Sequence, residues 1–372
     1  MKIQRLEVRH VRLRLKAPFE TSFGTKQDID HVLVRVDDSE GLTGWGEGAC
    51  QANPYYSPDT YETTLHVLRD FIAPAVVGRE ITWPGDLPAE VRKIRGHPYA
   101  KAALDMALWD LEGRRRNVPV AALLGGTRAR IESGVSLGLE AGGFDALRPS
   151  IERYLAEGYR RIKLKIKPGQ DETLACAFRR HYPKTPLMLD ANSAYTLDDV
   201  ALLGRLDAYD LMMIEQPLAH DDIVDHATLQ RALATPICLD ESIHSAADGR
   251  KALDIGACRI VNVKVGRVGG LTEAQRLHDV CLARGAPVWC GGQHEFGIGR
   301  AANVAIASLP GFTLPGDVSG SDRYYVEDLA EPPFLVNDGT LEVPAGPGLG
   351  VTVVQGRLER FTVARLEFAA SR

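Results

Sequence analysis

The chain has 372 residues, of which 45% are hydrophobic and 25% charged, and its formal net charge is −5. This composition is typical of a globular protein, and it excludes the strongly basic surface that nucleic acid or an anionic membrane would attract. No apolar run approaches the ~18 residues that cross a membrane. The six cysteines form no C-x-x-C pair, which favours buried thiols in a reducing compartment. We therefore expect a cytoplasmic protein.

The first part of the chain predicts a small α+β domain, residues 1–125. The patterns predict strands at residues 3–15, 31–36 and 42–47, and helices at residues 59–76 and 98–116. Pro98 suits the first turn of the second helix. Two irregular segments, residues 17–24 and 48–57, are either lids over a site or long hairpin connections.

The rest of the chain repeats a short apolar run followed by a segment of helix length. The runs are residues 134–139, 161–166, 186–190, 211–215, 236–240, 260–265, 287–290 and 312–315. Eight strand–helix units at near-even spacing are the pattern of a parallel (β/α) barrel. We predict an α/β fold, a modified TIM (β/α)-barrel at residues 126–317, with an α+β capping domain. Residues 318–372 are expected to return to that capping domain.

Charged residues end four of these runs at nearly constant intervals. Asp190, Glu215, Asp240 and Lys264 follow one another at intervals of 25, 25 and 24 residues. Because the strand ends of a parallel barrel face one mouth, these side chains should converge. Carboxylate oxygens that leave positions for water or substrate suit Mg²⁺, for which Mn²⁺ or another divalent cation can substitute. For any single one of these acids, a role as a helix N-cap or in an ion pair is a better explanation than metal binding. Three acids at successive strand ends, however, favour a metal site.

Lysines are the second unusual group. Lys163, Lys165 and Lys167 alternate on the second expected strand and therefore share one face. Such a pattern usually marks a solvated edge, but a strand inside a closed barrel has none. Lys264 ends the sixth strand, across the barrel, and two nearby ammonium groups lower a lysine pKa toward that of a general base. Two opposed lysines can move protons on both faces of an α-carbon, while a divalent metal stabilises the enediolate between those steps.

The strand-end motifs carry a family resemblance that covers almost the whole chain. They are K-L-K, L-D-A-N, I-E-Q-P, C-L-D-E-S, K-V-G-R-V-G-G and W-C-G-G, with A-P-F-E-T-S-F-G and W-G-E near the start. Together they resemble the enolase superfamily, muconate-lactonising branch, and most of all its N-succinylamino acid racemase/o-succinylbenzoate synthase subfamily. Arg267, three residues after Lys264, resembles the hallmark of racemase-capable members.

The resemblance implies roles for individual residues. It makes Asp190, Glu215 and Asp240 the Mg²⁺ ligands. It makes Lys165 and Lys264 the acid/base groups on opposite faces of the substrate, with Lys163 tuning Lys165, and it makes the two irregular segments substrate-covering lids. The implied substrate-binding residues are Phe19, Gln51, Ser136, Asn192, Arg267, Gly292, Gln293, His294, Asp317 and Tyr324. For Asp317, a role as a structural cap is as good an explanation as a substrate contact.

At some positions the residue differs from the one that the subfamily pattern predicts, and in each case the residue present is more polar. Gln293 and His294 stand where a Met and an apolar residue are expected before Glu295. Gln51 replaces an apolar lid residue such as Met, and Tyr324 replaces a Phe. A lone histidine is more often structural than functional. Four such changes around one expected acyl pocket nevertheless predict a preference for a substrate with a polar or charged distal group over N-succinyl derivatives of purely aliphatic residues.

The resemblance implies Mg²⁺-dependent abstraction of the proton α to a carboxylate, through an enediolate, with racemisation of an N-acyl (N-succinyl) amino acid as the leading function. The alternatives are the lyase reaction of o-succinylbenzoate synthase, and an unassigned, more polar substrate in the same branch. A non-catalytic barrel that binds a carboxylate would have no use for two opposed bases. The expected partners are a small-molecule carboxylate substrate and further copies of the chain, from dimer to octamer, but neither nucleic acid nor membrane.

Overall fold

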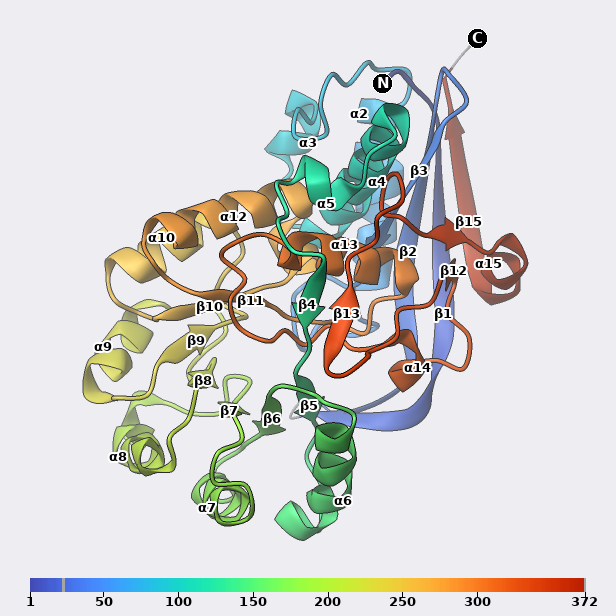
Figure 1. Ribbon diagram of the computed structural model, residues 1–372. Coiled ribbons are helices and arrows are strands. Elements are labelled where there is room, and N and C mark those ends of the chain that lie inside the picture. The colour runs from blue at the N-terminus through green and yellow to red at the C-terminus, as the bar shows by residue number, and fades with distance from the viewer. Residues whose placement is uncertain (22–23, 371–372) are drawn as a thin grey trace.

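The structure is a computed structural model that describes residues 1–21 and 24–370. It combines an antiparallel sheet, packed against helices, with a curled parallel sheet that carries helices on its outside (Figure 1). The predicted fold class, an α/β barrel with an α+β capping domain, is confirmed. The domain boundaries at residues 125 and 317 stay predictions.

The capping part is built on a four-stranded antiparallel sheet in the order β15-β1-β2-β3. Its strands are β1 (Ile3–Thr21), β2 (Gly24–Asp38), β3 (Thr43–Gly48) and β15 (Thr362–Ala369). Alternation along the strands puts apolar partners together, so that Leu6 lies opposite Val36 and both are buried. Because β15 pairs with β1, the end of the chain returns to its beginning.

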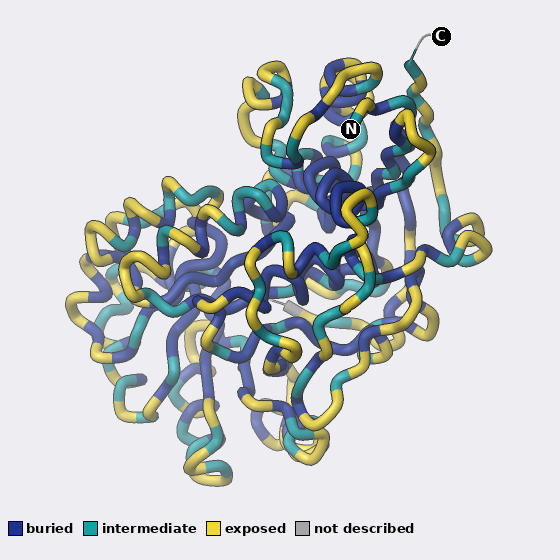
Figure 2. Tube along the Cα trace, turned by 45° about the horizontal axis from the view of Figure 1, so that its top comes forward, coloured by how far each residue is buried: buried dark blue, intermediate teal, exposed yellow. Residues whose placement is uncertain are grey.

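Helices cover one face of this sheet. They are α1 (Tyr61–Val67), the π-helical η1 (Leu68–Ile72), α2 (Ala73–Val76), α3 (Ala89–Lys93) and α4 (Pro98–Arg116). Helix α4 begins at Pro98 as predicted, and it ends where Asn117 adopts a left-handed φ of 57°. It is buried over most of its length (Figure 2). The glycines of β3 allow the strand to pack closely against α4, since a Cβ at Gly46 would lie 2.0 Å from the carbonyl oxygen of Ala103 in that helix.

Seven parallel strands form the barrel wall in chain order, from β5 to β11. They are β5 (Val135–Leu137), β6 (Ile162–Lys165), β7 (Leu187–Asp190), β8 (Met213–Glu215), β9 (Ile237–Leu239), β10 (Ile260–Val263) and β11 (Val288–Cys290). The helices between and after them are α6 (Gly143–Ala156), α7 (Asp171–His181), η2 (Leu197–Asp199), α8 (Val200–Arg205), η3 (Leu206–Tyr209), α9 (Val224–Ala232), α10 (Ala246–Asp254), α11 (Val265–Val268), α12 (Leu271–Ala283) and α13 (Gly297–Ala307). The strands are short buried apolar runs, as predicted (Figure 2).

The eighth expected strand, residues 312–315, is not a regular strand. It touches its neighbours only through isolated bridges, Val288 with Phe312 and Ser133 with Gly316. Pro315 has no N–H to donate to a ladder, and its carbonyl accepts a hydrogen bond from the Arg161 side chain at 2.9 Å. The seven-stranded wall is therefore completed by an extended segment instead of a strand.

The second strand also ends earlier than expected. Strand β6 stops at Lys165, and Lys167 lies beyond it, exposed and followed by Pro168. The prediction that three lysines share one strand face therefore holds for Lys163 and Lys165 only.

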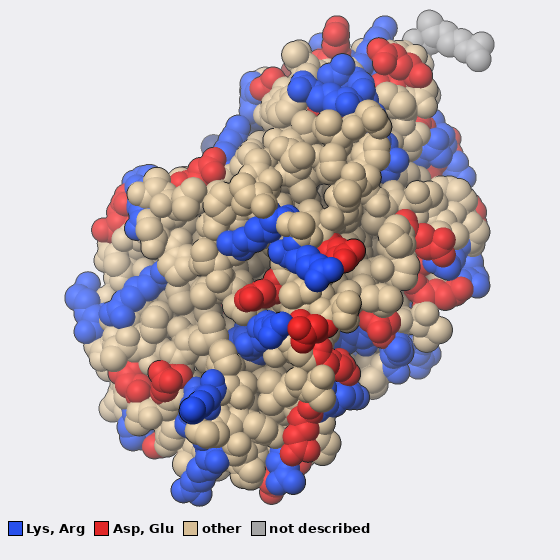
Figure 3. Space-filling view, in the orientation of Figure 1, with Lys and Arg blue, Asp and Glu red and all other residues tan. Residues whose placement is uncertain are grey.

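The remaining elements lie around these two sheets. They are α5 (Val120–Leu123), β4 (Arg130–Glu132), α14 (Ser321–Tyr324), β12 (Ala330–Glu331), β13 (Thr340–Glu342), β14 (Thr352–Val353) and α15 (Gln355–Phe361). Within the described ranges, no helix is long and apolar enough to cross a membrane. All six cysteines are free thiols. Acidic and basic side chains are interspersed over the face shown in Figure 3, without one extended basic patch.

We predict that Gly46→Ala destabilises the protein by about 1–3 kcal/mol or more, because the added methyl group collides with the backbone of α4. Gly204→Ala is the matched control, since a Cβ at that helical position meets nothing within 4 Å. The control should be neutral or stabilising by about 0.5–1 kcal/mol. Urea unfolding of both variants measures the difference, and equal stabilities would contradict this account of the β3–α4 contact.

Candidate active site

The carboxyl ends of the barrel strands carry the predicted acids. Asp190 is the last residue of β7 and Glu215 the last of β8, and the two are direct partners in the sheet. Asp240 follows β9 directly. All three side chains are buried, with at most 1% of their surface exposed. The barrel thus brings residues far apart in the chain to one mouth, as predicted.

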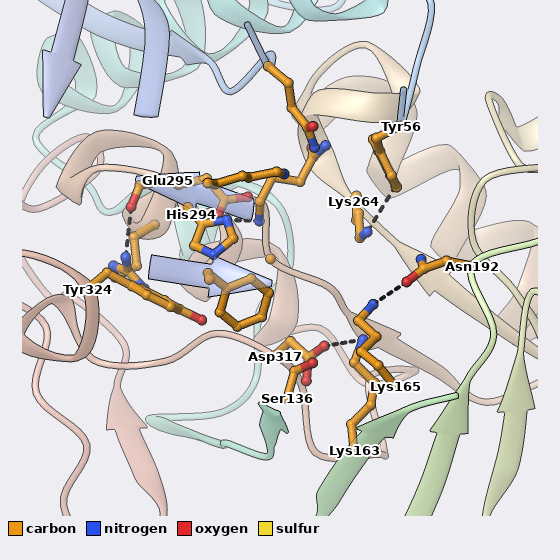
Figure 4. Close-up of a pocket in the computed structure, with 16 residues that line it drawn as sticks. Tyr56, Ser136, Lys163, Lys165, Asn192, Lys264, His294, Glu295, Asp317 and Tyr324 are labelled. Atoms are coloured by element: carbon orange, nitrogen blue, oxygen red, sulfur yellow. Dashed lines mark hydrogen bonds and ion pairs between the residues drawn. The ribbon is translucent and has the colours of Figure 1, made fainter. Parts of the chain in front are cut away.

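Two lysines of β6 lie among these carboxylates. The Lys163 Nζ atom is 2.9 Å from Glu215 Oε2 and 3.1 Å from Asp190 Oδ2. The Lys165 Nζ atom is 2.5 Å from the same Asp190 oxygen and 2.6 Å from Asn192 Oδ1. One carboxylate therefore holds both ammonium groups, and Asn192 fixes the second (Figure 4).

Lys264 lies on another side of the mouth and is held by Asp240 and by a tyrosine of the capping part. Its Nζ atom is 2.7 Å from Asp240 Oδ2 and 2.9 Å from the Tyr56 hydroxyl oxygen. The Tyr56 hydroxyl donates to Asp240 Oδ1 at 3.0 Å, and its ring centroid is 4.4 Å from the ammonium nitrogen. Tyr56 belongs to the predicted lid at residues 48–57, so this contact joins the lid to the barrel.

The carboxylates decide the direction of the lysine pKa shifts. Burial alone would lower the pKa of Lys163, but the negative charges of Asp317, Glu215 and Asp190 outweigh it and raise this pKa above its usual value. The pKa of Lys264 is likewise raised, because neighbouring oxygens outweigh burial. The positive charge of Lys264 does lower the pKa of Lys163, as predicted, but the carboxylates outweigh it, so the net pKa shift is upward for Lys163, as it is for Lys264.

Lys165 and Lys264 face a single cavity of about 690 Å³ with its open mouth included (Figure 4). Most of the predicted substrate-binding residues line it: Phe19, Gln51, Ser136, Asn192, Gly292, Gln293, His294, Asp317 and Tyr324. Asp317 also holds Lys163 and Arg161, at 2.5 and 2.8 Å, and these two cations lower its pKa against the opposing effect of burial.

Arg267 is the exception. Its side chain is 2% exposed and does not line the cavity. Helix α11 begins directly after Lys264 and turns the guanidinium group inward, where it donates to the Ile243 carbonyl at 2.8 Å and to the Asp240 carboxylate. The predicted substrate contact of Arg267 is therefore wrong in this structure, where the residue positions Asp240 instead.

Aromatic rings form one wall of the cavity. The His294 ring contacts Phe19 and Tyr324 edge to face, with centroids 5.0 and 4.8 Å apart. His294 has a φ of 63°, a left-handed conformation that costs free energy in a residue other than glycine and is found at functional sites. Burial holds the pKa of His294 well below its usual value, so the imidazole is neutral. Residues 22–23 of the predicted lid lie outside the described residues.

Sequence reasoning missed several residues at this mouth. Lys26, Tyr56, Glu295 and Arg300 also line the cavity. Glu241 lies beside it, where burial and the charge of Asp190 raise its pKa to about 7. Two of these residues could have been found from the sequence. Glu241 directly follows Asp240 in the C-L-D-E-S motif, and Tyr56 lies in the predicted lid at residues 48–57. The sequence carried no signal for Lys26, because its strand reaches the mouth only through the tertiary structure.

The geometry agrees with what comparison with known families finds. Residues 146–356 match the family described as "Enolase C-terminal domain-like". Residues 3–125 match the family described as "Mandelate racemase / muconate lactonizing enzyme, N-terminal domain". The chain belongs to the enolase superfamily.

Relatives within the enolase superfamily match over nearly their whole length. An o-succinylbenzoate synthase of Geobacillus kaustophilus is 51% identical over 97% of this chain and 96% of its own. An N-succinylamino acid racemase of an Amycolatopsis species is 47% identical over 98% of this chain and 99% of its own. The crystal structure of an enolase-superfamily member from Listeria innocua superposes with a TM-score of 0.96, at 39% identity and 99% coverage of both chains. The protein is therefore an enzyme of this superfamily.

Enolase-superfamily members generally use a divalent metal, typically Mg²⁺. Within residues 1–21 and 24–370, no three His, Cys, Asp or Glu side chains converge to hold a metal ion. Asp190, Glu215 and Asp240 thus share one mouth without forming a ready set of three ligands, because Asp240 is turned toward Lys264 and Arg267, and their role as metal ligands stays a prediction. The donor set nevertheless fits Mg²⁺, since it is all oxygen, buried and placed at successive strand ends. Asp190 and Glu215 already share one cation, the Lys163 ammonium group.

We predict that the protein binds one Mg²⁺ or Mn²⁺ ion per chain and that Glu215→Gln weakens this binding. The loss should exceed the about 10–100-fold that changes around a metal's direct ligands cost. Titration calorimetry measures both affinities. Glu90→Gln, which changes an exposed acid of helix α3, serves as the control and should bind like the parent protein. Unchanged affinity in Glu215→Gln would contradict the assignment of this ligand.

Proposed function

We propose that this enzyme removes the proton α to a substrate carboxylate and racemises N-acyl amino acids, N-succinyl amino acids in particular. The observation that carries the proposal is the placement of Lys165 and Lys264. Their side chains come from the second and the sixth strands of the wall and reach one cavity from different sides (Figure 4). The 47% identity to an N-succinylamino acid racemase supports the choice of substrate.

In this mechanism each lysine serves one face of the α-carbon. Lys165 takes the proton of one enantiomer while Lys264 delivers a proton to the opposite face, and the roles exchange for the other enantiomer. Asp190, Glu215 and Asp240 would hold a Mg²⁺ ion, which when bound supplies positive charge beside the reacting carboxylate. Carboxylates that hold such a cation no longer raise the pKa of the lysines, which brings the lysines closer to the range of a general base.

A second candidate is the formation of o-succinylbenzoate. The 51% identity to an enzyme of that name favours it. In that reaction Lys165 removes the α-proton, the C–O bond on the neighbouring carbon breaks, and the hydroxide leaves as water after taking up a proton. The same residues serve both reactions, so the cavity geometry does not separate them. A third candidate is another reaction of the muconate-lactonising branch, on a substrate whose group farthest from the reacting carbon is more polar.

We predict opposite stereochemical defects in two variants. Lys264→Ala should still exchange the α-proton of one enantiomer in D₂O, and Lys165→Ala that of the other. Each should lose racemisation by about 10²–10⁴-fold, the usual contribution of a positioned acid or base. Proton NMR of N-succinyl amino acids in D₂O with Mg²⁺ measures the exchange.

Lys167→Ala is the control, because this lysine is exposed outside β6 and does not line the cavity. It should leave exchange unchanged. If both active-site variants lost exchange of both enantiomers equally, the two-base mechanism would be wrong. Formation of o-succinylbenzoate would not be excluded by that result, since it requires only Lys165 to move a proton.

The polar residues that depart from the subfamily pattern support a polar distal group on the substrate. Gln51, Gln293, His294 and Tyr324 all line the cavity. Two of their polar groups are satisfied within the protein, since the Gln293 amide donates to the Tyr99 hydroxyl at 2.6 Å and the Tyr324 hydroxyl accepts from the Arg323 guanidinium group at 3.0 Å. In the described part of the chain, however, Gln51 Oε1, Gln293 Oε1 and His294 Nε2 are buried without a hydrogen-bond partner. Such atoms reject a substrate that leaves them unpaired.

We predict that the double variant Gln51→Met/His294→Met shifts preference toward substrates with an aliphatic distal group. The ratio of kcat/KM between a polar and an aliphatic substrate should fall by about 10-fold or more, because each unpaired buried group costs about 1–3 kcal/mol. Mg²⁺ affinity should stay unchanged. A loss of stability with no change in that ratio would show that these side chains only support the lid.

A further inference from the structure

Lys26 is a cation of the cavity wall whose ammonium group is unpaired within the described part of the chain. It lies on β2 opposite Phe19 of β1, at the end of the hairpin that reaches over the barrel. Its side chain is partly buried and lines the main cavity. Lys165 and Lys264 each pair with a carboxylate, whereas the ammonium group of Lys26 has no ion-pair or hydrogen-bond partner among residues 1–21 and 24–370.

Lys26 also joins the main cavity to a second one. This side cavity, of about 560 Å³ with its opening included, lies under the β2 end of the hairpin. Lys26, Gln51, Gln293 and His294 line both cavities. Two of these four residues carry unpaired polar atoms, since Gln51 Oε1 and His294 Nε2 are buried without a partner in the part of the chain that is described.

The surroundings of Lys26 are those of a group that needs an anion. Burial, together with the positive charges of Lys264 and Lys165, lowers the pKa of Lys26 to about 7. His294 is neutral and can donate one hydrogen bond from its ring. Gln51 can turn its amide to donate another. A carboxylate accepts from all three groups, and its charge offsets the unfavourable burial of the ammonium group.

We propose that Lys26, with His294 and Gln51, binds a second carboxylate of the substrate, the one at the end of its N-acyl group. This inference rests on the proposed function and specifies how the enzyme selects its acyl group. The acyl end is the part that all substrates of an N-acyl amino acid racemase share, whereas the amino-acid side chain varies. A fixed charge in the wall therefore suits the acyl end.

The test compares two ligands that differ only in that charge. N-succinyl-leucine carries the distal carboxylate, and N-succinamoyl-leucine carries a carboxamide of the same shape in its place. Calorimetry in Mg²⁺ should show the diacid binding about 10–100-fold more tightly to the parent enzyme, the range of a hydrogen bond to a charged group. Lys26→Met should abolish this preference, and Lys26→Arg should keep most of it. Lys167→Met removes an exposed lysine that does not line the cavity and should behave like the parent.

The outcomes separate the inference from the proposed function. If the parent enzyme binds both ligands equally, or Lys26→Met keeps the preference for the diacid, the inference is overturned, whether or not the enzyme racemises either compound. If neither compound is racemised but the preference still depends on Lys26, the proposed function fails and the carboxylate subsite stands. Thermal melting of each variant checks folding, and Lys26→Gln replaces Lys26→Met if the latter does not fold.

Discussion

The ammonium group of Lys163 is the contact on which the mouth of the barrel depends. It lies 2.5 Å from Asp317, 2.9 Å from Glu215 and 3.1 Å from Asp190, and so joins three segments of the wall. Burying an ion costs several kcal/mol unless it is paired, and a buried group left alone after its partner is removed is strongly destabilising. The acids and bases of the site therefore hold one another in place. The same network holds Lys165, since Asp190 Oδ2 contacts both lysines.

The capping part supplies the rest of the site, and its contacts explain why a barrel alone would be incomplete. The Tyr56 hydroxyl contacts both Lys264 and Asp240, so a lid residue helps to orient a barrel lysine. Phe19 packs against His294, and Lys26 follows on the paired strand. The sheet can sit this close because β3 carries glycines where α4 crosses it. The wall of the cavity is thus built partly by segments far in sequence from the barrel strands.

Several expectations failed for a shared physical reason, which is that local patterns do not report on neighbours in space. Arg267 follows the lysine at the expected spacing, yet a single helical turn directs it to Asp240 and away from the cavity. The ammonium groups were expected to lower one another's pKa, but three carboxylates around Lys163 act in the opposite direction. Pro315 and the carbonyl contacts of its segment keep the eighth run from pairing as a strand.

The sequence by itself determined the fold class and the positions of the acids and lysines at the mouth. This was possible because the strand–helix repeat has a fixed length, and a parallel barrel places every strand end on one rim. Only the tertiary structure decided which of these charges pair, which lid residues reach the cavity, and that the Lys26 ammonium group stands there without a partner among the residues that the structure describes. Ion pairing and burial depend on distances of a few ångströms between segments far apart in the chain, as between Tyr56 and Lys264, which are 208 residues apart, and no local spacing encodes them.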